Sequence, residues 1–154
     1  MADPHSADRP ASLSEKLDRG DLMAVACPSR EVLKHMTSRW GVLVLIALLP
    51  GTQRFSDLRR KISGVSERML AQTLQWLEGD GIVQRRAFKV VPPHVEYSLT
   101  PLGREAAERV QGLADWIEVN MPAIAAHWDA AGMQAEQEKS RPSGRLSAQR
   151  SVRA

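Results

Sequence analysis

Arginine and glutamine side chains gather on one face of the segment SERMLAQTLQWL, residues 66–77. At about 100° per residue, a helix over this segment places Leu70, Leu74 and Leu77 together on the other side. Arginine and glutamine pair bidentately with the major-groove edges of guanine and adenine, so the polar face has the chemistry of base readout. In an isolated helix such a face is more often only solvated, so the neighbouring elements decide. The predicted readout residues are Ser66, Glu67, Arg68, Gln72 and Gln75.

Basic side chains flank that segment on both sides. Residues 54–89 contain eight arginines and lysines against four acidic residues, whereas residues 90–133 contain two against six. Lysine and arginine neutralise phosphates and hold a protein on the DNA backbone. A charged strand alone is often a solvated edge, so the order of the elements carries this prediction. The predicted backbone contacts are Arg54, Arg59, Arg60, Lys61, Arg85, Arg86 and Lys89.

Short helices and one hairpin must position these residues. Apolar residues at helical spacing, preceded by capping residues, predict four helices, over residues 29–36, 39–49, 55–62 and 67–78. The last two are joined by a turn that contains Gly64, which indicates a helix-turn-helix. Two runs of β-forming residues then flank Pro92-Pro93, and they predict a two-stranded hairpin with the prolines at its tip.

A longer amphipathic helix follows the hairpin. Thr100-Pro101 is a strong start, with a capping hydroxyl and a proline at the first helical position. A break is expected at Asn120-Met121-Pro122, before a short helix over 123–128. The long helix has more apolar surface than a small domain needs, which predicts a homodimer and an inverted-repeat site with half-sites about one helical turn apart. The predicted interface residues are Val110, Leu113, Trp116, Ile117, Met121 and Ile124.

The 154 residues, 43% of them apolar, suit one globular domain. We expect an N-terminal arm over 1–22, partly disordered with a short helix capped by Ser12, a domain over 23–131, and a disordered basic tail over 132–154. No segment reaches the 18 apolar residues of a membrane span, and the N-terminus lacks the apolar core of a signal peptide. A cytoplasmic protein with no membrane partner is expected.

Two long runs, RFSDLRRKISGVSERMLAQTLQWLEGDGIV and VPPHVEYSLTPLG, give the chain a family likeness. Residues 27–103, which contain both, resemble the HxlR family of winged helix-turn-helix transcription regulators, relatives of the MarR regulators. The resemblance implies a mainly α fold with a small β-wing that dimerises through its terminal helices. It also implies a bacterial homodimer on double-stranded DNA, with paired recognition helices in successive major grooves and wings along the backbone.

Three positions depart from the usual pattern of that family. His94 stands where arginine is frequent in the wing, which weakens its backbone contact unless the imidazole is protonated. Trp76 occupies a commonly acidic place, and Thr37-Ser38 replaces a glycine-containing turn. These changes affect the expected operator sequence more than the fold.

Cys27 is the only cysteine, so no internal disulfide can form. It precedes Pro28 at a predicted helix start, where unpaired amides and the helix dipole favour a reactive thiolate. Its position matches the cysteine with which several HxlR-like regulators sense oxidants or electrophiles such as quinones and aldehydes. The resemblance thus implies switching through an intersubunit disulfide, a mixed disulfide or an adduct. A buried, inert thiol is an equally weighted alternative.

Other function classes find little support in the sequence. The four histidines have no cysteine partner at ligand spacing, so no metal site is predicted. No phosphate-binding glycine loop or nucleophile elbow is present, so neither an enzyme nor a cofactor is expected. We expect a repressor or activator of a nearby stress or metabolic gene. Two alternatives stay open: an interaction module that has lost DNA binding, and a regulator with a non-covalent ligand in the dimer crevice, near Trp40 or Trp116.

Overall fold

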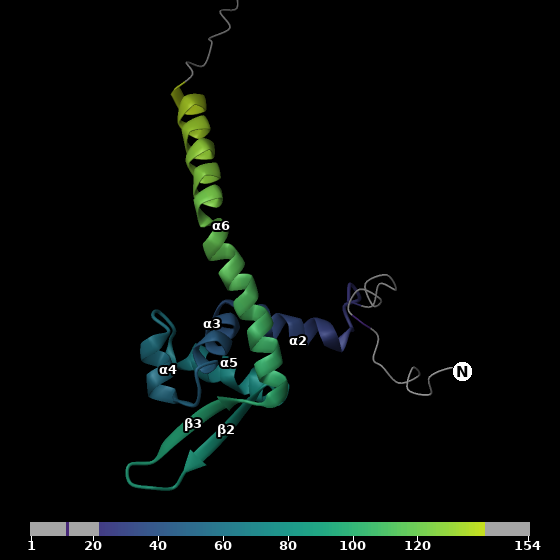
Figure 1. Cartoon of the computed structure of the whole chain (residues 1–154), viewed down its shortest axis with the longest axis vertical. Coiled ribbons are helices and arrows are strands. Elements are labelled where there is room, and N and C mark those ends of the chain that lie inside the picture. Colours follow the sequence, from purple (N-terminus) through teal and green to yellow (C-terminus); the bar gives the residue numbers. More distant parts are fainter. Residues whose placement is uncertain (1–11, 13–21, 141–154) are drawn as a thin grey trace, which may run out of the picture. The chain divides into compact units, whose positions relative to one another are not determined.

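Helices dominate the part of the chain that the computed structural model describes, residue 12 and residues 22–140 (Figure 1). The chain divides into two compact units, Met1–Leu113 and Ala114–Ala154. In chain order the elements are α2 (Pro28–Thr37), α3 (Arg39–Leu48), β1 (Gln53–Arg54), α4 (Phe55–Lys61), α5 (Glu67–Gly79), β2 (Val83–Phe88), β3 (His94–Leu99) and α6 (Pro101–Ser140).

Hydroxyl side chains cap three helices at the predicted starts. Ser38 Oγ accepts a hydrogen bond from the Gly41 N–H at 3.1 Å, at the first turn of α3. Ser66 Oγ accepts one from the Met69 N–H at 3.1 Å, at the first turn of α5. Thr100 Oγ1 does the same for the Gly103 N–H at 2.9 Å, at the start of α6. Such caps satisfy amides that have no partner within the helix, so local sequence alone fixes these starts.

The sheet has three antiparallel strands in the order β1-β3-β2, one strand more than the hairpin that the sequence predicts. The predicted pair is present as β2 and β3, and Figure 1 shows this hairpin extending beyond the helices. The added strand pairs Gln53 with Tyr97 and Arg54 with Glu96. Two residues are too few for a periodic pattern, and this strand exists only because β3 offers it a free edge.

A single hydrophobic cluster holds the helices and the sheet together. The amphipathic helix α5 contributes Leu70, Leu74 and Leu77, all 1% exposed or less, and α4 contributes Leu58. The apolar helix α3 lies at the centre, as predicted, with its buried residues Gly41, Val44, Leu45, Ala47 and Leu48. The first unit therefore has its own core, and α5 is fixed by its apolar side with its polar side left outward.

Helix α6 continues through Pro122 to Ser140, so the predicted break at Asn120-Met121-Pro122 is wrong. Proline removes one backbone hydrogen bond and usually kinks a helix. Here the following residues, AIAAHWDAAGMQAEQEK, are rich in strong helix formers, and these favour continuation on the far side. The helix also passes residue 131, where the domain was expected to end. The predicted arm helix after Ser12 and residues 141–154 lie outside the described residues.

No helix within residue 12 and residues 22–140 is long and apolar enough to cross a membrane.

Candidate nucleic-acid interface

The polar face of α5 is presented to solvent by the packing of its opposite side. Leu70, Leu74 and Leu77 are buried in the core, and Thr73 joins them with its hydroxyl donating to the Met69 carbonyl at 2.8 Å. The burial of a polar residue on this side was not predicted from the sequence. Of the predicted readout residues, Gln72 is half-buried and the others are exposed: Ser66, Glu67, Arg68 and Gln75.

The turn between α4 and α5 fixes the angle of the helix-turn-helix. Ile62 and Val65 are buried on either side of Gly64, which has φ +87°. A side chain is disfavoured at that φ, so glycine permits the tight reversal. The ring of Trp40 from α3 lies next to this turn, 3.9 Å from the position that a Gly64 Cβ would take. The turn therefore packs beside the Trp40 ring.

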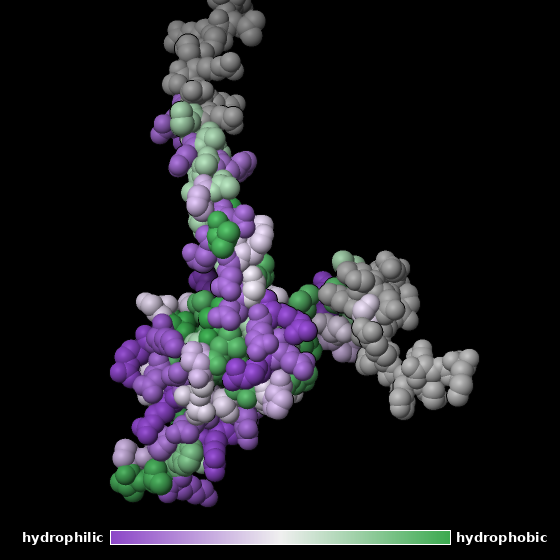
Figure 2. Space-filling model, viewed as in Figure 1, coloured by the Kyte–Doolittle hydropathy of each residue, from purple (hydrophilic) through white to green (hydrophobic). Residues whose placement is uncertain are grey.

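Two of the three basic residues of α4 have acidic partners. Arg60 is bonded to Asp57 on the same helix. Arg59 Nη1 lies 3.7 Å from Glu67 Oε2, across the turn on α5. Both side chains of this second pair are more than half exposed, so water weakens the interaction. Figure 2 shows the hydrophilic surface over α4 that these residues and Lys61 form.

The wing residues are linked in one chain of ring contacts. The Arg86 guanidinium lies 5.2 Å from the Phe88 ring centre, and the Phe88 ring stacks on His94 at 4.8 Å. His94 Nε2 is 3.3 Å from Glu96 Oε1. His94 is thus half-buried and already paired within the wing, while Arg85, Arg86 and Lys89 are exposed. The contacts order this face of the wing and leave its cations accessible.

The tip of the wing is apolar, which the sequence reasoning missed. Val91 is fully exposed and Val90 is about half exposed, and Figure 2 shows a hydrophobic patch at this end of the hairpin. The sequence predicts Val90 at the end of a strand, because β-formers precede it, and Val91 in the loop beside Pro92-Pro93. The position of Val91 next to the two prolines was the available signal for an exposed apolar tip.

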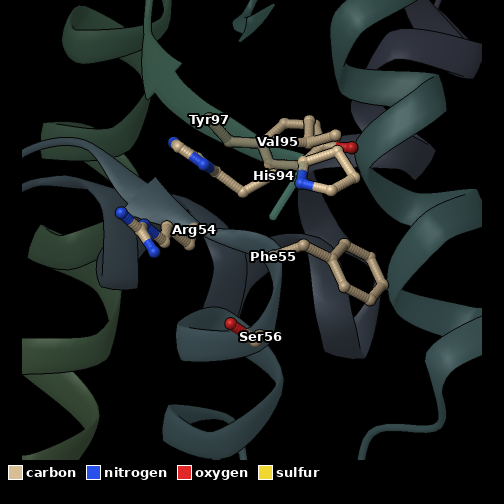
Figure 3. Close-up of a pocket in the computed structure, with 7 residues that line it drawn as sticks. Arg54, Phe55, Ser56, His94, Val95 and Tyr97 are labelled. Carbon is tan, nitrogen blue, oxygen red and sulfur yellow. The ribbon is translucent and has the colours of Figure 1, made fainter. Parts of the chain in front are cut away.

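A cavity of about 330 Å³ lies between the start of α4 and strand β3 (Figure 3). In the close-up, the Arg54 and His94 side chains extend to one side and the Phe55 ring to the other. The centres of the Phe55 and Tyr97 rings are 6.4 Å apart, and the two rings form the apolar part of the cavity wall. The full lining is Arg54, Phe55, Ser56, Pro93, His94, Val95 and Tyr97.

A second hollow of about 490 Å³ continues along α4 toward the start of α5. It shares Phe55 and Ser56 with the first cavity and adds Arg59, Arg60 and Glu67. The two hollows form what we call the α4 trough, which runs from the first half of strand β3 to the start of α5. Cations and a hydroxyl beside an apolar wall are groups that suit a sugar-phosphate backbone.

The remaining predicted residues lie away from the trough. Cys27 is half-buried and is the N-cap of α2. Val110 is packed against the core, so part of its apolar surface is covered within the first unit. Leu113, Trp116 and Ile117 are exposed, and Met121 and Ile124 are half-buried.

Trp76 has a defined contact that sequence reasoning did not find. Its ring stacks on His35 of α2, with ring centres 5.2 Å apart and an interplanar angle of 8°. His35 Nδ1 in turn lies 2.6 Å from Asp80 Oδ2. These residues lie 45 positions apart in the chain, and no local pattern joins them. In the described part of the chain, histidines and acids form no group of three that could hold a metal ion.

Comparison with known proteins decides the family. The sequence model of the HxlR-like helix-turn-helix family matches residues 35–125, more than half of the chain. The chain belongs to the HxlR-like helix-turn-helix family. It is 68% identical to the uncharacterized HTH-type transcriptional regulator YtfH of Escherichia coli (strain K12) over 115 residues, which is 75% of this chain and 91% of YtfH.

Solved structures agree with the HxlR-like assignment. The ytfH protein of Salmonella typhimurium has a TM-score of 0.68 and 65% identity, over 70% of this chain and 96% of that one. The redox regulator HypR in its reduced form has a TM-score of 0.59 and 34% identity, over 64% of this chain and 98% of HypR. The protein is therefore a transcriptional regulator with a winged helix-turn-helix domain, and it is not an enzyme.

Proposed function

We propose that this regulator binds operator DNA as a homodimer, with α5 in the major groove and the wing beside the backbone. The observation that carries the proposal is the placement of the α5 polar face at the end of the α4 trough. A recognition helix needs phosphate contacts on its flanks to fix its register, and base-reading side chains at its N-terminal end. Both sets of groups lie on adjoining surfaces of the first unit.

Arg68 is the main candidate for base readout. It is the second residue of α5, in the first turn after the Ser66 cap, and it is exposed. Its side chain has no ion pair or hydrogen bond within the described residues. A guanidinium with no internal partner can pair with guanine O6 and N7 without breaking a contact first. Gln72 and Gln75 extend the same face and suit adenine.

The predicted backbone contacts divide by their surroundings. Arg54 lines the trough beside the Ser56 hydroxyl, which the sequence did not single out, and Arg86 is exposed in the wing. Arg59 has Glu67 as a neighbour, which a phosphate would have to displace. His94 is held by Phe88 and Glu96, so its part in binding is smaller than that of an arginine at the same place.

Pairing of two copies supplies the symmetry of the operator. Exposed apolar side chains on α6, Leu113, Trp116 and Ile117, are suited to an isologous interface. Two α5 helices related by a two-fold axis read an inverted repeat whose half-sites lie about 34–36 Å apart.

Binding to the DNA upstream of the protein's own gene, followed across a salt series by fluorescence anisotropy, tests the proposal. We expect affinity that falls steeply with salt and that exceeds the affinity for random DNA by about 10³-fold or more. Affinity that barely changes with salt, or equal affinity for random DNA, would contradict it. A stable complex with another protein and no DNA binding would favour the interaction-module alternative.

Two variants separate base readout from backbone contact. Arg68→Ala should lose about 1–3 kcal/mol of discrimination per half-site and relax the sequence preference. Arg86→Ala should weaken binding to all sequences alike and lower the salt slope by about one per half-site. Equal and uniform losses from both variants would contradict these roles.

Oxidation or electrophile modification of Cys27 is the proposed switch. HypR, a structural relative, is a redox regulator, and Cys27 stands at the start of α2, where the thiol is half-buried and without a disulfide partner in its own chain. Release of DNA by diamide or an aldehyde should be lost in Cys27→Ser. Identical responses of the variant and the wild type would eliminate this switch.

A non-covalent effector is the second candidate, and one observation favours it. An apolar groove of about 540 Å³ lies between α3, the end of α4 and the first part of α6. Its walls include Leu43, Ile46, Leu49 and Ile62, with Lys61 at one side; Trp40 and Trp116 are not among its lining residues. An effector bound here would release DNA from Cys27→Ser as well as from wild type, and Leu43→Trp should block that release.

A further inference from the structure

Helix α2 lies at the surface of the first unit. None of its residues from Pro28 to Thr37 is buried, although Met36 packs partly against the core. Its last turn is joined to α3 through Ser38, whose hydroxyl donates to the His35 carbonyl at 3.0 Å and accepts from the Gly41 N–H at 3.1 Å. The His35 ring near the end of α2 makes a further specific contact, and its partner is α5.

The His35 ring makes two contacts with the end of α5. Its Nδ1 lies 2.6 Å from Asp80 Oδ2, and both side chains are only 16% exposed. An ionised carboxylate can only accept, so the imidazole donates this hydrogen bond. The same ring lies parallel to Trp76 at 5.2 Å. Partial burial strengthens both interactions relative to a solvent-exposed pair. We refer to His35, Trp76 and Asp80 as the α2–α5 clamp.

Asp80 is the C-cap residue of α5. The Asp80 N–H donates to the Trp76 carbonyl at 3.1 Å, and the Ile82 N–H donates to the Leu77 carbonyl at 2.9 Å. Gly81 adopts φ +73° between them, and the Ile82 side chain is buried. This is a Schellman ending, which fixes the direction of the chain after the helix. The His35 side chain therefore contacts α5 at an end whose backbone direction is fixed.

The placement of both α5 residues is otherwise unfavourable. A carboxylate at the C-terminal end of a helix faces the negative end of the helix dipole, and a half-buried tryptophan beside the polar face of a reading helix leaves apolar surface near water. His35 offsets both features, since it donates to the carboxylate and covers the indole ring.

We propose that His35, Trp76 and Asp80 are positioning residues that hold α5 at the angle required for base readout, so that the seating of α2 sets operator specificity. The proposal rests on the DNA-binding function proposed above. With 13 residues, α5 is about 20 Å long, so a tilt of about 5° at its clamped end moves the base-reading end by about 1.7 Å. Hydrogen bonds to bases tolerate only a few tenths of an ångström, whereas long arginine and lysine side chains can still reach phosphates.

The test compares binding to two duplexes, one selected by the wild-type protein from a random-sequence library and one with the same bases scrambled. His35→Leu keeps apolar volume on α2 but removes the hydrogen bond. We expect it to lower affinity for the selected duplex by about tenfold, within the range of about 5–150-fold typical of coupling between sites, and to leave affinity for the scrambled duplex unchanged. Asp80→Asn should act in the same direction.

Two further variants distinguish positioning from a general structural role. His35→Asn, whose amide nitrogen can take the place of Nδ1, should recover most of the selected-duplex affinity that His35→Leu loses. Glu31→Ala, a change at an exposed residue of the same helix, should match wild type on both duplexes. Affinities are corrected for the folded fraction measured by thermal denaturation, and if His35→Leu does not fold, Asp80→Asn carries the test.

The outcomes separate the two proposals. If His35→Leu or Asp80→Asn keeps the full preference for the selected duplex, or loses affinity for both duplexes equally, the clamp proposal is overturned. If the wild-type protein itself shows no preference, the proposed DNA-reading function is overturned, and the clamp proposal falls with it.

Discussion

Replacing Gly103 by alanine should destabilise the protein, although alanine is the better helix former. Gly103 lies in the first turn of α6, and a Cβ there would be 1.9 Å from the Ile82 carbonyl oxygen and 2.8 Å from its carbonyl carbon. Both neighbours are backbone atoms. The Ile82 carbonyl also accepts the Thr100 N–H at 3.1 Å, and the Ile82 N–H is bonded to Leu77. The neighbouring backbone is therefore held from both sides.

The magnitude follows from the displacement that is needed. An ordinary Cβ contact lies at 3.4–4 Å, so α6 and the start of β2 would have to separate by about 1.5 Å, an overpacking that costs about 3 kcal/mol or more. Alanine recovers about 1 kcal/mol through its helix propensity. The net loss is about 2 kcal/mol, which corresponds to a fall in Tm of about 4–8 °C for a chain of this size.

Gly112 on the same helix is the matched control. A Cβ there meets nothing within 4 Å, so Gly112→Ala should gain up to about 1 kcal/mol. Thermal unfolding followed by circular dichroism gives both values, with all samples at one protein concentration because dimerisation shifts Tm. If Gly103→Ala is as stable as Gly112→Ala, the close approach of α6 to Ile82 is refuted.

Three further changes probe α5. Ser66→Ala removes the cap of α5 and should cost about 1 kcal/mol; an unchanged Tm would mean that the Met69 amide finds another partner. Leu74→Ala leaves a cavity in the core and should cost about 2–5 kcal/mol in chemical denaturation, and a loss below about 1 kcal/mol would contradict its full burial. Glu67→Gln frees Arg59 from its 3.7 Å partner; non-specific DNA affinity should rise several-fold with a steeper salt dependence, and weaker binding would instead favour a role for the Glu67 carboxylate in base readout.

The comparison between sequence and structure is clearest in α5. Its leucine spacing and its serine cap are local signals, so the helix, its start and its inward side were predicted correctly from the sequence. The same reasoning assigned Glu67 to the predicted base-reading face. It did not predict that the Glu67 carboxylate lies beside Arg59 of the preceding helix. Which partner a charged side chain finds across a turn depends on the angle between the two helices, and no spacing rule contains that angle.

Helix α6 shows a limit of local rules. The Pro122 signal is real, because proline lacks the N–H that the helix ladder needs. Helix formation is cooperative, however, and long runs of good helix formers on both sides can carry a helix through one lost bond. A rule that ends a helix at each proline does not weigh the flanking segments against it.

By itself, the sequence determined the caps, the helix-turn-helix, the hairpin and the family, because each depends on residues within a few positions of one another or on one long ordered match. Only the tertiary structure decided the pairing of β1 with β3, the closure of Gly103 on Ile82 and the stacking of Trp76 on His35. These contacts join residues that are distant in the chain. Their geometry is set by the packing of the core as a whole, so it appears only when the elements are assembled.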